Sequence, residues 1–295
     1  MRRLVLLVVA LLCPVASLAD GFVFLGSFGN GATYPHPLVN PYGLTVAPDG
    51  TIWVAVAGRM SAMHFTATGT YLSETTSPIS NPTGVAVLTS GEIVLASSAG
   101  AARYNADGSG KTALGTGSCY AVVADPVGGF WMSQQRTNGG SLMLSWPQMG
   151  ALYNIYGTPM GFAVTSDGTF YVANSMWNRI DVMCGPGPSF SWGTTGSAPG
   201  QFSLPSDVEI ADGLVYVADA VNNRVQIFQL DGSFVAQFGT AGTSPGNLLR
   251  PSGIAVAPDG TIYVSEVSNN RVSRFAWAPT ASVPSSWGRI KTLFR

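Results

Sequence analysis

The chain has 295 residues; 36 are glycine, 10% are charged, and the formal net charge is −1. A near-neutral chain lacks the basic footprint of nucleic-acid binding, so we expect no nucleic-acid partner. Single all-β domains commonly reach this length, and high glycine with low charge is typical of tight turns between buried strands.

The first nineteen residues have the pattern of an export signal. Residues 2–3 are arginines, residues 4–12 form an apolar core, and Ser17-Leu-Ala19 has the small residues of a cleavage site at its first and third positions. A membrane anchor is the weaker interpretation, because about twenty apolar residues are needed to span a bilayer. We therefore expect residues 1–19 to be a signal peptide, no membrane span, and a secreted or periplasmic mature protein.

A strand-like segment, Phe22–Gly29, stands alone before the repeats described next. It matches Phe234–Gly239, which is the last strand of a repeat, whereas the final repeat stops after its third strand at Phe275. We expect the N-terminal strand to supply this missing outer strand. Such pairing would close the domain and cover edges that otherwise promote aggregation.

A block of about forty residues recurs six times along the chain. Each block has two β-branched or aromatic runs separated by a glycine turn such as Asp259-Gly260, then a third run, a second turn and a fourth strand. The position of Gly253 in the last block corresponds, by alignment, to Gly43, Gly84, Tyr120, Gly161 and Asp207 in the others.

This period predicts an all-β fold, a six-bladed β-propeller of four-stranded antiparallel blades closed by the N-terminal strand, over residues 20–278. A β-sandwich is the alternative, but the strands of a sandwich do not repeat block by block.

The last two blocks resemble the NHL repeat family. The motifs that carry the resemblance are Pro251-Ser-Gly-Ile, the tyrosine-valine second strand at Tyr216-Val217, and Asn-Asn-Arg-Val at 222–225 and 269–272. The resemblance covers roughly residues 22–276 and is weakest in the third block. It implies a propeller fold, whereas function varies widely among such proteins.

The repeated Asn-Asn-Arg motif has two interpretations. Asp219 and Glu266 each lie five residues before an arginine, Arg224 or Arg271. The arginines could form a ring of ligand-binding guanidinium groups. The favoured interpretation is a hairpin staple, in which each arginine bridges a carboxylate and backbone carbonyl groups.

Two carboxylates occupy unusual positions on an innermost strand. Asp207 and Glu209 stand where other blocks have glycine and alanine or threonine, and their spacing of two places them on one face. They predict either a channel-lining site for a cation or polar ligand, or carboxylates that bind loop amides and channel water. The second interpretation is favoured, and metal binding stays open.

The loops between blades, together with those joining second and third strands, open on one face, which we name the loop face. Loops on a rigid scaffold often carry function, and exposed Trp and Arg are typical contact anchors. Trp177 could be such an anchor or could fold back onto the fifth blade. The candidate ligand-binding residues are His36, Gln135, Arg136 and Trp177, with Asp207 and Glu209 in the channel.

An enzyme is the second class of function. With His36 and His64 as the only histidines, a three-histidine zinc site is impossible, and no nucleophile motif is present. His64 lies in an alternating strand and is expected to pack rather than to catalyse. We expect a non-enzymatic binding scaffold that presents its loop face to a protein or glycan surface; the alternative is a metal-dependent lyase or lactonase of the propeller type. The sequence names no cofactor and no oligomeric state.

Two further features remain. Cys119 and Cys184 are predicted on opposite faces, so we expect two mostly buried thiols rather than a disulfide.

Residues 279–286 read as a Pro/Ser-rich linker, and residues 287–295 alternate apolar with basic side chains. That last segment could be a docking or sorting tag or a surface segment.

Overall fold

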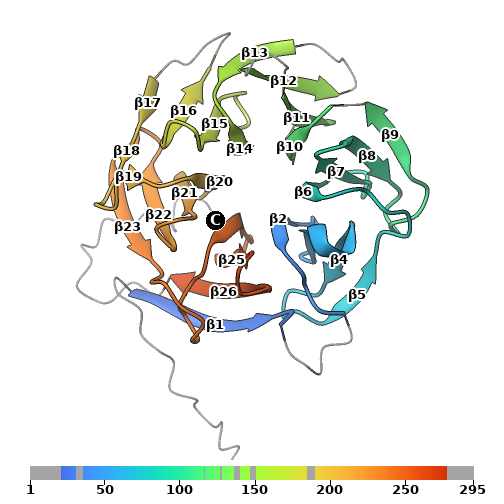
Figure 1. The fold of residues 1–295 in the computed structure, drawn as a ribbon, viewed down its shortest axis with the longest axis horizontal. Helices are drawn as coiled ribbons and strands as arrows, with labels where there is room; N and C mark the ends of the chain where they lie inside the picture. Colours follow the sequence, from blue (N-terminus) through green and yellow to red (C-terminus); the bar gives the residue numbers. More distant parts are fainter. Residues whose placement is uncertain are drawn as a thin grey trace, which may run out of the picture.

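The computed structural model describes residues 21–30, 36–115, 117–126, 128–135, 140–146, 151–184 and 190–277. Within these residues the long strands form six four-stranded antiparallel sheets, the blades, arranged in a ring around a central axis (Figure 1). The prediction of an all-β propeller is therefore confirmed. The predicted signal peptide and C-terminal segment lie outside the described residues.

In each blade the first strand lies nearest the axis and later strands lie progressively outward (Figure 1). Blades one to three comprise β2 (Pro41–Val46), β3 (Ile52–Val56), β4 (Ser61–Phe65) and β5 (Tyr71–Glu74); β6 (Pro82–Val87), β7 (Ile93–Ser97), β8 (Gly100–Tyr104) and β9 (Thr112–Gly115); and β10 (Cys119–Ala124), β11 (Phe130–Gln135), β12 (Gly140–Trp146) and β13 (Ala151–Tyr156). Blades four to six comprise β14 (Pro159–Val164), β15 (Phe170–Asn174), β16 (Arg179–Met183) and β17 (Phe190–Trp192); β20 (Pro205–Ala211), β21 (Leu214–Asp219), β22 (Arg224–Gln229) and β23 (Phe234–Phe238); and β24 (Pro251–Val256), β25 (Thr261–Glu266), β26 (Arg271–Trp277) and β1 (Phe22–Phe28).

Two smaller elements lie between strands of the blades. The 3-10 helix η2 (Ala57–Arg59) follows β3. Strands β18 (Thr194–Thr195) and β19 (Gln201–Phe202) form a short parallel pair in the loop between blades four and five.

The second strands are almost entirely buried, because each blade packs both of its faces against neighbours. Every residue of β3, β7, β15 and β21 is buried. A strand covered on both faces reads as a continuous apolar run rather than an alternating one, as in Ile52–Val56. The core therefore consists of apolar layers between blades, and each blade depends on its neighbours for burial.

Strand β1 completes blade six by pairing antiparallel with β26, with Phe22 opposite Trp277 and Phe28 opposite Val272. A bulge at Gly26 lies between these ends. The ring of Phe22 lies 4.6 Å from that of Phe238 in blade five, and the ring of Phe28 lies 5.0 Å from that of Phe65 in blade one. The N-terminal strand thus packs against both blades that flank blade six.

Small residues on the innermost strands let successive blades approach closely. A Cβ atom added to Gly253 would lie 2.6 Å from the carbonyl oxygen of Tyr42 and 3.0 Å from the Cα of Gly43. A Cβ atom added to Gly84 would lie 3.2 Å from the Cα of Ala121. The inner strands therefore meet backbone to backbone around much of the axis.

The alignment of the third block with Tyr120 is wrong by one residue. Ala121 takes the place of Gly253, because the backbone N–H of each donates to a serine on the next strand: Ala121 to Ser133 (3.0 Å) and Gly253 to Ser265 (2.8 Å). Tyr120 instead lines the central channel. A tyrosine at a channel position costs no packing space, which explains why a large residue is tolerated there.

The staple interpretation of the Asn-Asn-Arg motif is confirmed for blades five and six. Arg271 donates to Glu266 Oε1 (2.6 Å) and to the carbonyl oxygens of Thr243 (2.9 Å) and Asn247 (2.7 Å). Arg224 holds Asp219 and the loop before β20 in the same manner. Both arginines are buried, so the alternative of ligand-binding guanidinium groups is wrong for them.

An asparagine side chain in the same turns forms a hydrogen bond to the neighbouring blade. The side-chain oxygen of Asn178, Asn223 or Asn270 accepts a hydrogen bond from the backbone N–H of the residue just before the next blade. These N–H groups belong to Leu204 (2.7 Å), Arg250 (2.9 Å) and Asn40 (2.9 Å). Donor and acceptor residues all have left-handed backbone conformations, which are costly for Leu and Arg and persist where contacts hold them.

The cysteines follow the prediction in part. Cys119 is buried in blade three, where burial raises the pKa of its thiol to about 12, whereas Cys184 is exposed at the end of β16. They form no disulfide with each other. The expectation that both thiols are mostly buried is wrong for Cys184, because β16 ends there and the chain leaves the blade.

Among the described residues no helix is long and apolar enough to cross a membrane.

Candidate functional site

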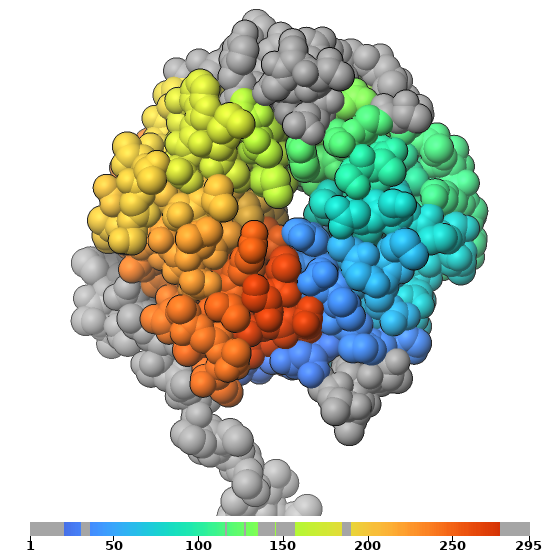
Figure 2. Space-filling model, in the orientation of Figure 1, coloured from blue at the N-terminus to red at the C-terminus, as the bar shows by residue number. Residues whose placement is uncertain are grey.

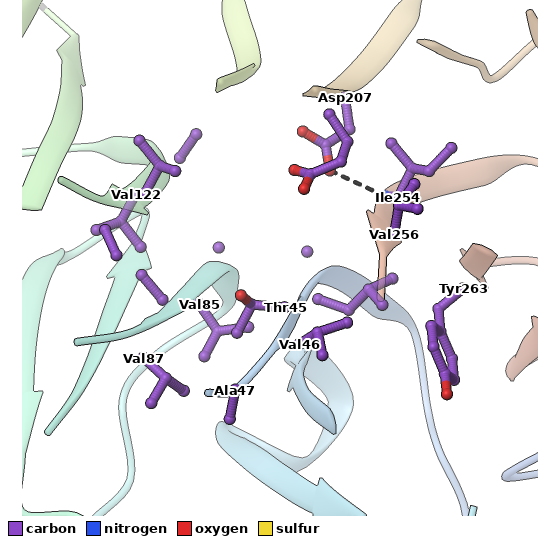
Figure 3. Close-up of a pocket in the computed structure, with 18 of the residues that line it drawn as sticks. Thr45, Val46, Ala47, Val85, Val87, Val122, Asp207, Ile254, Val256 and Tyr263 are labelled. Atoms are coloured by element: carbon purple, nitrogen blue, oxygen red, sulfur yellow. Dashed lines mark hydrogen bonds between the residues drawn. The ribbon is translucent and has the colours of Figure 1, made fainter. Parts of the chain in front are cut away.

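A central channel of about 720 Å³ runs between the innermost strands, and the space-filling view shows its opening at the centre of the ring (Figure 2). Its walls are largely aliphatic. Val46, Val85, Val122 and Ile254 face one another around the open space in Figure 3. The turns between first and second strands line one end of the channel, which we name the turn-side mouth.

Asp207 projects into this channel from β20 and is held by two backbone groups. The N–H of Val208 donates to Oδ1 (2.9 Å), and the N–H of Ile254 in blade six donates to Oδ2 (3.0 Å; Figure 3). Gly161 of blade four provides the space, since a Cβ atom there would lie 2.1 Å from Asp207 Oδ1. The carboxylate of Asp207 is thus bound by strand amides, whereas the favoured interpretation named loop amides and channel water.

Glu209 lines the same channel two residues further along β20. No described group donates a hydrogen bond to its carboxylate. Burial, and then the charge of Asp207, raise the pKa of Glu209 to about 8. Burial also raises the pKa of Asp207 to about 7, although its two backbone hydrogen bonds oppose the shift. Asp207 and Glu209 are therefore partly protonated near neutral pH, whereas ordinary carboxyl groups are ionised there.

These shifts predict that stability falls as pH rises. Unfolded carboxyl groups titrate near pH 4, so between about pH 4 and 8 the native state binds more protons than the unfolded state. The free energy of unfolding should decrease across that window. Glu209→Gln should flatten the decrease and raise stability at pH 8 by about 1 kcal/mol or more. Urea unfolding of the wild type, Glu209→Gln and Glu92→Gln at pH 5, 6.5 and 8 checks the prediction. Glu92 is the control, because its side chain is about one-third exposed and lies outside the channel lining. Parallel pH profiles for all three proteins would contradict the prediction.

The channel carries negative groups without positive ones. Among its described lining residues none is Lys, Arg or His. Five lining residues carry carboxylates, three of them in turns at the turn-side mouth: Asp49, Asp125, Asp207, Glu209 and Asp259. A positively charged or hydrogen-bond-donating group would therefore be favoured inside over an anion.

The six candidate binding residues do not form one site. Asp207 and Glu209 lie in the channel, whereas the ring of His36 stacks on Tyr71 of blade one at 4.0 Å. Gln135 is the last residue of β11, and Arg136 lies outside the described residues.

Trp177 lies in the turn between β15 and β16, on the loop face. The guanidinium carbon of Arg179, in the same blade, lies 4.3 Å from the centre of its ring. Arg179 also forms an ion pair with Asp181 at 2.6 Å. The tryptophan is thus held in place from one side while 46% of its surface remains exposed.

Trp177 belongs to an apolar patch that sequence reasoning recognised only in part. Leu204 is adjacent because its N–H bonds to Asn178, and Val221 is adjacent because its N–H bonds to the carbonyl of Ser203 (3.1 Å). The exposed fractions are 61% for Met176, 46% for Trp177, 44% for Leu204 and 50% for Val221. We name these four residues the blade 4–5 patch.

The sequence did not lead us to predict Val221 as a surface contact residue. It could have been recognised as an apolar residue immediately before the Asn-Asn-Arg turn, where the chain is directed to the surface.

The structure accounts for His64 as a packed residue. Its ring stacks on Trp53 at 4.2 Å, and its Nε2 lies 2.8 Å from the Thr51 hydroxyl. Burial lowers its pKa. Among the described residues no three His, Cys, Asp or Glu side chains lie close enough together to hold a metal ion.

Comparison with known proteins identifies the repeats. The family model described as "NHL repeat" matches residues 202–228 and 248–275. Protein brain tumor from Drosophila melanogaster is 42% identical over 79 residues, 26% of this chain and 8% of that protein. NHL repeat-containing protein 3 from Homo sapiens is 32% identical over 94 residues, 31% of this chain and 26% of that protein. The chain thus matches about a quarter or less of the length of these relatives.

Solved structures show the fold at low sequence identity. An auxiliary nutrient binding protein from Bacteroides thetaiotaomicron aligns with a TM-score of 0.67 and 11% identity, over 82% of this chain and 70% of that one. Virginiamycin B lyase from Staphylococcus aureus aligns with a TM-score of 0.59 and 12% identity, over 86% and 99%. At such identities the likeness concerns architecture alone. The matched residues, which span most of blades five and six, are thus NHL repeats.

Proposed function

We propose that this protein is a non-enzymatic binding platform, a six-bladed ring closed by its N-terminal strand, which recognises a protein surface through the blade 4–5 patch. The observation that carries the proposal is that four exposed apolar side chains lie in turns of blades four and five that are hydrogen-bonded to one another. Monomeric proteins rarely expose such clusters without a partner, and tryptophan is enriched among energetically dominant contact residues.

The backbone beneath the patch is fixed, which favours binding. Leu204 is held by Asn178, and the loop before it is held by the buried Arg224 through the carbonyl oxygens of Ser197 and Gln201. Binding to a loop already ordered in this way loses little conformational entropy. A partner would therefore meet a preformed surface.

Export is part of the proposal. The support for it is the signal-like pattern of residues 1–19. The partner is then sought among secreted or cell-surface molecules, which include proteins and glycans.

Affinity capture from the native secretome tests the binding platform. Trp177→Ala should weaken capture of the specific partner by about tenfold or more, the loss typical of a dominant contact residue. Leu72→Ala is the matched control, because Leu72 is also 46% exposed but lies on the outer strand of blade one. Arg136→Ala tests the remaining loop candidate. Equal capture by the wild type and by Trp177→Ala would overturn the assignment of the patch, and loss on deglycosylation would identify a glycan ligand.

The lyase or lactonase alternative has the support of fold likeness alone. A metal assay with lactone and lyase substrates distinguishes it from binding. Under that alternative, activity would be lost in the Asp207→Asn/Glu209→Gln double variant, whereas partner capture through the patch would not change.

A further inference from the structure

The channel carries a charge imbalance that the loop-face function does not use. Asp207 has two backbone donors, but Glu209 has none among the described residues. Asp49 and Asp259 at the turn-side mouth accept bonds within their own turns, from Thr51 and Thr261. Such turn bonds leave a carboxylate charged. The described lining has no basic residue, and the nearby Arg274 donates to the carbonyl oxygen of Ala67 rather than to a mouth carboxylate. The lining of the mouth is therefore acidic.

The chain leaves its last described strand beside this mouth. Ala276 of β26 lies opposite Thr261 of β25, two residues after Asp259. Strands β26 and β24 are separated only by β25 in the sheet, which is a lateral distance of about 10 Å. Residue 277 thus ends near the turn that contributes Asp259 to the channel mouth.

The remaining segment has the complementary charge and sufficient length. Residues 278–295 contain Arg289, Lys291 and Arg295 and no acidic residue. The Pro/Ser-rich stretch before Trp287 could extend about 30 Å, well beyond the distance to the axis. Ile290 and Phe294 alternate with the cations, and the channel walls offer valine and isoleucine side chains.

We propose that residues 287–295 bind in the turn-side mouth of this chain's own channel, with their basic side chains facing the mouth aspartates Asp49 and Asp259. The segment acts as an intramolecular plug. It compensates the channel charge and competes with any cationic ligand for the same space. This inference concerns the end of the ring opposite the loop face, so it stands or falls independently of the blade 4–5 patch.

A peptide titration tests the plug. The probe is a fluorescently labelled peptide of residues 287–295, and the receptor is the full chain carrying Arg289→Gln, Lys291→Gln and Arg295→Gln, so that its own segment cannot compete. The peptide should bind this receptor and should bind the unmodified chain at least about fivefold more weakly, because a tethered competitor has a high effective concentration. Affinity should also fall with added salt.

Matched channel variants locate the binding site. Adding Asp49→Asn and Asp259→Asn to the receptor should weaken peptide binding by about tenfold, a loss expected for two charge contacts. Adding Asp107→Asn, an exposed turn carboxylate outside the channel lining, should leave it unchanged. Absence of peptide binding to the receptor, or binding unaffected by the channel substitutions, would overturn the proposal.

Cross-linking distinguishes the chain's own segment from that of a second copy. In a Cys184→Ser background, Thr292→Cys should form a disulfide with Thr45→Cys, which lies in the channel wall (Figure 3), but not with Thr112→Cys on the exposed outer strand β9. The product should be a cross-linked monomer at all protein concentrations. Cross-linked dimers, or equal reaction at both positions, would contradict intramolecular docking.

Discussion

Deletion of residues 21–29 should yield a chain that is insoluble or that melts far below the full-length protein. The deletion uncovers the edge of β26 and removes Phe22 and Phe28 from the layers they share with blades five and one. Loss of one buried phenylalanine ring costs about 3–5 kcal/mol, a large share of the 5–15 kcal/mol that stabilises typical domains. Thermal unfolding, with aggregation followed by light scattering, is the measurement.

Point variants separate the packing contribution from the loss of the strand. Phe22→Ala should lower the free energy of unfolding by about 3–5 kcal/mol. Leu25→Ala, at an exposed position beside the bulge of the same strand, should change it by less than about 0.5 kcal/mol. If the deletion left the melting temperature unchanged, β1 would have no role in holding the ring together.

Replacement of Arg271 by alanine should destabilise the protein by about 3–5 kcal/mol, because it leaves the buried carboxylate of Glu266 without its cationic partner. The loop before β24 would also lose the donors that hold the carbonyl oxygens of Thr243 and Asn247. Chemical unfolding at pH 7 measures the effect. Arg271→Lys should recover little, since an ammonium group cannot reproduce the planar fork of donors.

The surface offers a matched comparison for this arginine. Arg103 pairs with Glu92 at 3.5 Å, with both side chains about one-third exposed. Arg103→Ala should cost less than about 1 kcal/mol, as exposed ion pairs do. Similar losses for the two arginine variants would show that burial of the Arg271 pair is not what makes it structurally important.

The architecture could be predicted because it depends on short sequence motifs that repeat along the chain. Each Asp-Gly turn and each β-branched run can be recognised from a few neighbouring residues. Six copies at a similar spacing exclude most other folds. The place of residues 22–29 could likewise be predicted, because they match the fourth strand Phe234–Gly239 and the last repeat lacks a fourth strand of its own. The staple role of Arg224 followed from the acid five residues earlier and from the recurrence of the motif in another blade.

The surface and the channel were less predictable because they depend on which residues meet across blades. Val221 and Leu204 lie seventeen residues apart and become neighbours only through the loop before β20. The inter-blade bond from Arg250 to Asn223 requires two left-handed backbone conformations that the sequence does not specify. The shift from Tyr120 to Ala121 has a different cause: Cys119 stands in the register position of Pro251, and the third block has no Pro-x-Gly motif that would show this in the sequence. Such three-dimensional coincidences leave little trace in a single sequence.

The pairing of β1 with β26 also determines the order of folding. Phe22 must find Trp277, which lies almost the whole described chain away, so this sheet has a far higher contact order than the other five. During synthesis β1 is made before all the other strands of the ring. It stays unpaired until its partner β26 has been made. Ring closure is then the last step of assembly, and an aromatic, aggregation-prone segment stays accessible to chaperones throughout that interval.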